Sequence, residues 1–327
     1  MMRLLLSSAT FVFITIVAVM AQPSEQELEK YFSSKPLGYS LGEQSTTFRL
    51  FAPRAQSVFI HFFKKPEDDA GRGVPMTKNS DGTWEYTEKK PASALIGTYY
   101  AYRVIGGSTF QGEAFDSSAL FADPYSRAVA TKNTYRHESR TLILHPNDDE
   151  KYDWKGDTFV VPANHNTLMI YEAHVRDLTA HQSSGVKAKG SYKGLAEQGK
   201  TGGIRYLKDL GINAVEFLPI HEFANIELPY RDSSTIAKFK VFNDGNPQER
   251  NHWGYMTSFY FAPESYYASE SSLAAGKWSG TDGRAVREFK DLVRALHKEK
   301  IAVIMDVVYN HVSDFDANPF KYIDKYY

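Results

Sequence analysis

The chain has 327 residues, of which 42% are hydrophobic and 24% charged, and its formal net charge is −1. This composition suits a globular protein of about two domains, and the near-neutral charge argues against nucleic acid or an anionic membrane surface as a partner. Cysteine is absent, which excludes disulfides, thiolate metal sites and a cysteine nucleophile.

The amino terminus has the pattern of a secretory signal peptide. Arg3 gives a cationic start, residues 4–20 carry no charge, and Val19 and Ala21 place small residues at a cleavage site before Gln22. We therefore predict a signal peptide over residues 1–21 and an exported protein, secreted or periplasmic. An uncleaved anchor helix is the alternative, and no later stretch resembles a membrane span.

Residues 36–135 are predicted to form a small antiparallel β-sandwich of the immunoglobulin-like kind. Alternating apolar and polar runs are separated by turn signals such as the one at residues 79–82. The strand-like runs cover residues 47–52, 57–63, 83–86 and 98–104. Trp84, in the third run, could offer its face to a sugar ring or pack inside the sandwich.

Residues 136–166 are polar and acidic, and we predict an exposed linker that still carries a short strand at 141–144. The acidic run of Asp148, Asp149 and Glu150 is expected to be a solvated loop.

From residue 167 the pattern changes to strands that alternate with helices. Strands are predicted at 168–175, 213–219 and 301–308, and helices at 202–210 and 284–298. The strands are almost continuously apolar, as expected when both faces are covered. This alternation predicts a parallel α/β unit.

Polar residues gather where two of these strands end. Asp306 and His311 follow the third strand, which is the position expected for an active site on the carboxyl-end face of an α/β barrel; a turn cap and a surface histidine are the alternative. At the end of the first strand, His174, Arg176 and Asp177 are expected to form a structural polar network rather than to contact a substrate.

Residues 194–201, GLAEQGKT, match the phosphate-binding loop pattern, and residues 301–306 could pass for its acidic strand. That mechanism needs a strand that runs directly into the glycine-rich loop. Residues 183–193 are not strand-like. We therefore predict a loop that enters a helix, and no nucleotide site.

Several motifs together resemble the α-amylase clan of glycoside hydrolases, in particular pullulanases, isoamylases and glycogen debranching enzymes. DVVYNH (306–311) is similar to the first signature motif, YEAHVRD (171–177) and AVEFLPIHEF (214–223) to the first two barrel strands, and NHWGY (251–255) with FAPE (261–264) to a segment of debranching enzymes. LFAPRAQSV (50–58), DGTWEY (81–86), GTYYAYRV (97–104) and DPYSRAV (123–129) resemble the β-sandwich module that precedes the barrel.

The resemblance implies a multidomain protein in which residues 167–327 form the first part of a (β/α)8 barrel and stop after about three of the eight strands. In the clan, the nucleophilic Asp, the acid Glu and a stabilising Asp follow the fourth, fifth and seventh strands. No catalytic residue is therefore expected within this chain, which is predicted to be an inactive amino-terminal fragment of a longer enzyme.

The resemblance also implies that this chain contains part of a substrate pocket. His311 should bind a sugar hydroxyl, Tyr255 should stack on the same sugar, and Asp306 should support them by orienting an arginine. Asn310 matches a position that binds calcium in many α-amylases, so calcium is a candidate ligand, and no other cofactor is implied. Met256 stands where many relatives have Asp, Asn or Ser, which leaves the bond specificity open.

The implied function is hydrolysis of α-glucans such as starch, glycogen or pullulan, by α-1,6 debranching with a retaining double displacement, which needs two carboxyl groups about 5–5.5 Å apart. An α-1,4-acting amylase and a glucan branching enzyme are alternatives. A glucan-binding fragment without catalysis is the alternative from a different class.

Overall fold

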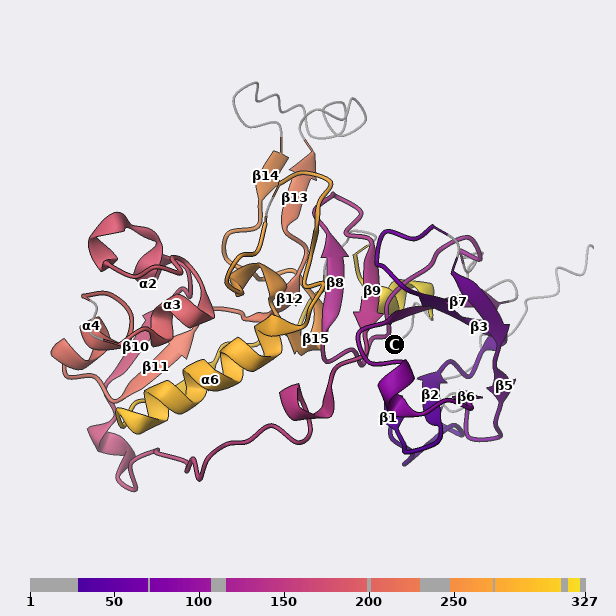
Figure 1. Cartoon of the computed structure of the whole chain (residues 1–327), viewed down its shortest axis with the longest axis horizontal. Helices are drawn as coiled ribbons and strands as arrows, with labels where there is room; N and C mark the ends of the chain where they lie inside the picture. The colour runs from indigo at the N-terminus through magenta and orange to yellow at the C-terminus, as the bar shows by residue number, and fades with distance from the viewer. Residues whose placement is uncertain are drawn as a thin grey trace, which may run out of the picture.

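The computed structural model describes residues 29–69, 71–106, 116–198, 201–229, 248–272, 274–312 and 317–323. The signal peptide predicted at residues 1–21 lies outside them. Within these ranges, no helix combines the length and the hydrophobicity that crossing a membrane requires. Figure 1 shows an elongated molecule in which a β-rich half lies beside an α/β half.

The β-rich half contains two antiparallel sheets. One has the strand order β1-β2-β6-β5 and the other β16-β8-β9-β7-β3-β4. The strands are Gly38–Leu41 (β1), Thr46–Phe51 (β2), Ala55–Phe63 (β3), Arg72–Pro75 (β4), Thr77–Lys78 (β5), Thr83–Glu88 (β6), Tyr99–Gly106 (β7), Val129–Lys132 (β8), Ser139–Leu142 (β9) and Trp278–Ser279 (β16). The four predicted strands are confirmed as β2, β3, β6 and β7.

The core between these two sheets is rich in aromatic rings. Phe48 of β2 is fully buried against Tyr100 of β7, with ring centroids 5.0 Å apart in an edge-to-face arrangement. Trp84 lies in the same core, only 5% exposed, and its indole N–H donates to the carbonyl oxygen of Ala52 at 2.9 Å. Trp84 therefore packs inside the sandwich, and the alternative of a sugar-binding platform at this position is wrong.

The segment predicted as a linker begins with a strand of the sandwich. β9 pairs with β7 and with β8, so it lies inside the larger sheet, and Thr141 and Leu142 are buried there. After β9, the connection to the α/β half contains the short 3-10 turns Pro146–Asp148 (η3) and His165–Thr167 (η4). Figure 1 shows this connection running along one side of the molecule.

The prediction that the acidic run in this connection is a solvated loop is wrong for Asp149, whose side chain is only 13% exposed, whereas the side chain of Glu150 is 63% exposed. Arg127 forms ion pairs with Asp149 at 2.6 Å and with Glu150 at 3.0 Å. Lys290 donates to the backbone carbonyls of Asp148 and Asp149 at 3.1 and 2.8 Å. The run is therefore held between a cation of the sandwich and a cation of the α/β half, which lie far from it in sequence.

The α/β half contains the predicted parallel sheet, in the order β10-β11-β17. The strands are Ile170–Ala173 (β10), Ala214–Phe217 (β11) and Ala302–Met305 (β17), and the helices are Asp177–Ala180 (α2), Tyr192–Ala196 (α3), Ile204–Asp209 (α4) and Arg284–Lys298 (α6). Gly194 lies within α3, so the glycine pattern at 194–201 begins inside a helix and no strand enters it. A nucleotide-binding loop is thereby excluded at this position.

Helix α6 spans the boundary between the two halves. At its start, Val286 packs with Leu142 and Leu144 of the sandwich. Further along, Leu292 and Leu296 are fully buried in the core of the α/β half. The apolar residues of the helix lie along one face because they recur at helical spacing, and this face packs against the sandwich at its start and into the core of the α/β half further along.

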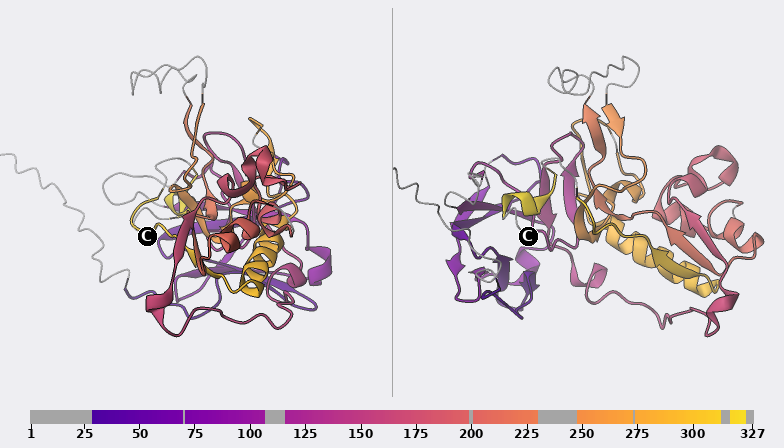
Figure 2. Two further views of the ribbon diagram at one scale, coloured as in Figure 1. Left: turned by 90° about the vertical axis from the view of Figure 1, so that its left-hand side faces the viewer. Right: turned by 180° about the vertical axis from the view of Figure 1, so that it is seen from behind.

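Antiparallel strand pairs lie between the two halves in Figure 1. They are β12 (His221–Phe223) with β15 (Thr257–Pro263), and β13 (Ile226–Pro229) with β14 (Gln248–Arg250). Strand β16 follows β15 in the chain, pairs with β8 and so extends the larger sheet of the sandwich. Figure 2 shows that the turn at Pro319–Tyr322 (η7) also returns to the sandwich, where Tyr322 stacks on Phe121 with ring centroids 5.5 Å apart.

A carboxylate is completely buried at this junction. Glu222 of β12 accepts hydrogen bonds from the hydroxyl of Thr131 in β8 at 2.8 Å and from the backbone N–H of Ser265 at 2.7 Å. Burial raises the pKa of Glu222 to about 7. The fully buried His137 lies 3.8 Å from the same carboxylate, and burial lowers the pKa of its imidazole to about 4.

The raised pKa of Glu222 makes the stability of the fold depend on pH. Between its usual pKa of 4.5 and about 7, Glu222 keeps in the folded protein a proton that the unfolded chain has lost, so this group destabilises the fold as the pH rises, whereas the lowered pKa of His137 acts in the opposite direction below about pH 6.5. Glutamine has nearly the same shape as glutamate and cannot ionise. We therefore expect Glu222→Gln to remove the loss of unfolding free energy that Glu222 causes as the pH rises, which amounts to at most about 3 kcal/mol. Urea unfolding of both proteins at several pH values between 5 and 7.5 measures it.

The control for this experiment is Glu150→Gln, which neutralises an exposed carboxylate on the connection. Parallel pH profiles for the wild-type protein and Glu222→Gln would show that Glu222 does not titrate in this window.

Candidate functional site

Tyr255, Asp306 and His311 come from two segments and meet at the carboxyl end of the parallel sheet. Asp306 follows β17 directly, and its backbone N–H donates to the carbonyl of Phe217 in β11 at 3.0 Å. The hydroxyl of Tyr255 donates to Oδ2 of Asp306 at 3.0 Å. Nε2 of His311 donates to the backbone carbonyl oxygen of Tyr255, also at 3.0 Å. The structure therefore brings together the three residues that the sequence motifs single out.

The local sequence explains how the loop that carries Tyr255 is shaped. Asn251 accepts a hydrogen bond from the backbone N–H of Gly254 at 3.0 Å, which closes a tight turn. Gly254 has a φ of 82°, and a Cβ at this position would lie 2.9 Å from both the Phe223 ring and the carbonyl oxygen of Pro219. Only glycine allows the loop to approach β12 this closely, and this approach aims Tyr255 at the sheet end.

The electrostatics of the site keep Tyr255 a neutral hydrogen-bond donor. Burial is the largest cause that raises the pKa of its hydroxyl to about 12, and the carboxylates of Asp306, Glu172 and Glu216 add to it. Glu172 and Glu216 stand in register on the neighbouring strands β10 and β11. The sheet end is therefore an acidic surface on which an uncharged, hydroxyl-rich ligand is favoured over an anion.

Glu172 and Glu216 were not singled out in the sequence, although a signal was present. Each is a charged residue in the middle of an otherwise apolar strand, and such a residue needs a polar environment on one face of the sheet. Two exposed aromatic residues, Trp253 (57% exposed) and Tyr309 (72% exposed), lie within the NHWGY and DVVYNH motifs but were given no role there.

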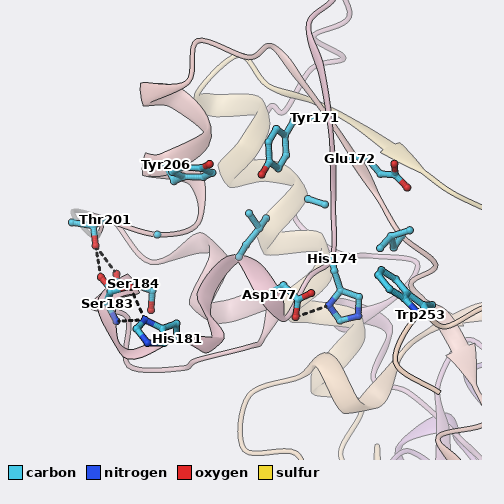
Figure 3. A pocket seen from close by; sticks show the side chains of 14 residues that line it. Tyr171, Glu172, His174, Asp177, His181, Ser183, Ser184, Thr201, Tyr206 and Trp253 are labelled. Atoms are coloured by element: carbon cyan, nitrogen blue, oxygen red, sulfur yellow. Dashed lines mark hydrogen bonds and ion pairs between the residues drawn. The ribbon is translucent and has the colours of Figure 1, made fainter. Parts of the chain in front are cut away.

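A pocket of about 750 Å³ opens beside this sheet end, next to β10. Figure 3 shows Glu172, His174, Asp177 and Trp253 around it. His174 is buried, and its Nε2 lies 2.8 Å from the backbone carbonyl oxygen of His252 and 3.0 Å from the hydroxyl of Tyr267. The polar network predicted at the end of this strand is thus present.

The prediction of calcium at Asn310 stays a prediction. Asn310 and His311 are exposed, and residues 313–316, which follow them, lie outside the described ranges. Within those ranges, the group of His, Asp and Glu side chains close enough to share an ion is elsewhere, at His174, Asp177 and His252.

A β-sandwich joined to a parallel α/β sheet, with carboxylates, a phenol and exposed aromatic rings at the carboxyl end of the strands, is an arrangement suited to binding a carbohydrate. The comparisons with known proteins agree. Residues 36–126 match the family model of carbohydrate-binding module 48, the isoamylase N-terminal domain.

Curated proteins and solved structures to which the chain is similar include isoamylases and pullulanases. Over 313 residues the chain is 37% identical to chloroplastic Isoamylase 3 of Oryza sativa subsp. japonica, covering 89% of this chain and 36% of that protein. It is 26% identical to the pullulanase of Bacillus subtilis (strain 168), covering 90% and 35%. The structure of the Paenibacillus barengoltzii pullulanase in complex with maltohexaose and α-cyclodextrin matches with a TM-score of 0.68 and 28% identity, over 90% of this chain and 41% of that chain.

The chain is therefore similar to isoamylases, pullulanases and glycogen debranching enzymes, and residues 36–126 match the model of the isoamylase amino-terminal carbohydrate-binding module. This confirms the resemblance read from the sequence motifs. The chain spans about a third of the length of the curated relatives, with 36% of the rice protein and 35% of the Bacillus protein covered.

The hydrogen bond between Tyr255 and Asp306 gives a direct test of the site geometry. We expect a double-mutant cycle of Tyr255→Phe and Asp306→Asn to give a coupling energy of about 1 kcal/mol, because the first change removes the donor and the second removes the charge of the acceptor in the same hydrogen bond. Urea unfolding of the four proteins measures the coupling.

The control cycle pairs Asp306→Asn with Tyr309→Phe, since Tyr309 is largely exposed and stacks on Tyr260 instead. A coupling energy of zero between Tyr255 and Asp306, equal to that of the control pair, would contradict the geometry.

Proposed function

We propose that this protein acts on α-glucans as a debranching glycoside hydrolase that cleaves α-1,6 bonds by a retaining double displacement. The observation that carries the proposal is the contact of Tyr255, Asp306 and His311 at the sheet end, next to a carbohydrate-binding module 48. Its relatives include isoamylases and pullulanases, and the similar Paenibacillus barengoltzii structure holds maltohexaose and α-cyclodextrin. No contact in the described residues favours α-1,4 cleavage or branching over debranching.

We also propose that β10, β11 and β17 are the first strands of a (β/α)8 barrel. The order of the strands in the sheet equals their order in the chain, all pairs are parallel, and helices connect them. In the described part of the chain, β10 and β17 are the edge strands, where a barrel would continue. The proposed division is a sandwich from residue 36 that includes β9, a connection that ends near 166, and the barrel from 167.

In this proposal the three site residues hold the sugar next to the cleaved bond. The bond to Asp306 fixes the rotation of the Tyr255 side chain, so the ring presents one face for stacking on a sugar. His311 uses Nε2 on the backbone of Tyr255, which leaves the other ring nitrogen for a sugar hydroxyl. Asp306 keeps its second oxygen for an arginine. The nucleophile and the acid are not assigned to any residue of this chain.

Export is part of the proposal. The cationic start, the apolar stretch and the small residues at Val19 and Ala21 support cleavage after residue 21, followed by secretion or release into a periplasm. The glucan would then be encountered outside the cytoplasm.

Activity on three glucans tests the proposed function. The protein made from its complete reading frame should release new reducing ends from pullulan and glycogen, whose α-1,6 bonds it would cleave, and none from amylose. Tyr255→Ala should lower kcat/KM on pullulan at least about tenfold, equivalent to about 1.4 kcal/mol of transition-state binding.

Phe159→Ala is the matched control, because Phe159 is an equally aromatic but 82% exposed residue on the connection. Release from amylose as well would favour the α-1,4-acting alternative. No reducing ends from any glucan, together with retarded migration of the protein in glycogen-containing gels, would replace the hydrolase by the glucan-binding alternative.

A further inference from the structure

We propose that His174, Asp177 and His252 form a binding site for a divalent transition-metal ion such as Zn²⁺. In the part of the chain that the structure describes, these residues are the group of His, Asp and Glu whose ligand atoms all lie within 4.8 Å of one another. Two imidazoles and one carboxylate are a donor set that suits zinc and its neighbours and that calcium, which prefers oxygen, does not favour. The site is thus distinct from the calcium predicted at Asn310.

The spacing of the donors is that of ligands around one ion. Nδ1 of His174 lies 3.6 Å from Oδ1 of Asp177, and Nε2 of His252 lies 3.3 Å from Oδ2 of the same carboxylate. With metal–ligand bonds of about 2.0–2.1 Å, neighbouring ligand atoms of a tetrahedral site are about 3.4 Å apart. Figure 3 shows His174 and Asp177 pointing toward each other at the rim of the pocket.

The protein holds His174 in the protonation form that a ligand needs. A carbonyl oxygen can only accept, so Nε2 of His174 carries the proton that it donates to the backbone of His252 at 2.8 Å. Nδ1 therefore keeps its lone pair, and this nitrogen is the one that faces Asp177. A second hydrogen bond on the far nitrogen of a metal-binding histidine is the usual way in which its tautomer and ring orientation are fixed.

Two features show what must change when an ion binds. The backbone N–H of Arg176 lies 3.2 Å from Nδ1 of His174, and the ion would replace this long contact. The ring of His252 stacks on that of His174 with centroids 4.4 Å apart, and it must turn to aim Nε2 at the ion. The side chain of His252 is 49% exposed, so it has room to turn.

The surroundings admit a cation from solvent. Asp177 has a side chain 57% exposed, which leaves space for water on the remaining coordination positions. Glu172 lines the same pocket and adds negative charge. The guanidinium of Arg176 lies over the Tyr266 ring, 4.3 Å from its centroid, and is engaged there.

An ion at this position would link the loop of residues 251–255, which carries Tyr255, to the end of β10. His252 belongs to the loop and His174 follows the strand, so their coordination would restrain the segment that begins at Asn251. The inference does not depend on glucan hydrolysis, because it predicts metal binding and loop stability in this chain itself.

Metal binding to the chelator-treated chain tests the proposal. We expect Zn²⁺ to bind with one ion per chain in isothermal titration calorimetry and to raise the Tm, and Co²⁺ to give the visible absorption of a site with nitrogen and oxygen ligands. His252→Asn should weaken binding at least tenfold and abolish the rise in Tm. Asp177→Asn should also weaken binding at least tenfold and abolish the rise in Tm, because it removes the carboxylate ligand that lies between the two histidines.

The matched control is His165→Asn, which removes an exposed histidine of the connection and should leave zinc binding unchanged. The Tm of each variant without metal shows that it folds. No binding of Zn²⁺ to the wild-type chain, or equal binding to wild type and His252→Asn, would overturn the proposal. The glucan assays would be unaffected by that result, so the two proposals can fail separately.

Discussion

The buried carboxylate of Glu222 joins the β-sandwich to the strand pair that supports the functional site. A carboxyl group without partners is costly in an apolar interior, and here the partners come from different parts of the chain. Thr131 donates from the sandwich strand β8, and Ser265 donates from the segment after β15. The bond from Thr131 exists only when the sandwich is docked against β12, so the cost of removing this partner from the buried Glu222 acts against separation of the two halves.

The same strand connects this junction to the functional site. Phe223 follows Glu222 in β12, and Gly254 packs closely against its ring. The backbone N–H of Phe223 donates to the buried carboxylate of Glu264 at 2.9 Å, which holds β12 beside the end of β15. A shift of the sandwich against the sheet would therefore disturb the loop that aims Tyr255. This gives the β-sandwich, through Thr131 of β8, a structural role at the site.

The sequence predicted the elements whose pattern is local. The strand over 47–52 appears as β2 at Thr46–Phe51, and the helix over 284–298 has the predicted bounds, because alternation and helical period depend on neighbouring residues. The motif resemblance placed Tyr255 and Asp306 in one substrate pocket, but their direct hydrogen bond was not predicted, since nothing in the spacing of residues 51 positions apart reveals it. For Trp84 the local sequence allowed two roles, a sugar-binding platform or packing inside the sandwich. Only the packing of the two sheets decides between them.

The remaining errors concern contacts across the junction. The run at Asp148 was predicted to be solvated because three successive acids favour water, but Arg127 and Lys290 approach it from segments that the local sequence does not connect to it. Likewise, the two-residue strand β16 is too short to leave a periodic signal, and it forms because β8 offers an edge. Glu222 is buried because the sandwich packs against β12, so the local sequence could not predict its burial.

Native-state hydrogen exchange in increasing denaturant tests whether the sandwich and the α/β half unfold as one cooperative structure. We expect backbone amides of β8 and β16, such as those of Thr131 and Ser279, to exchange with the same opening free energy as amides of α6. A sandwich that opens at clearly lower free energy, while α6 stays protected, would contradict this expectation.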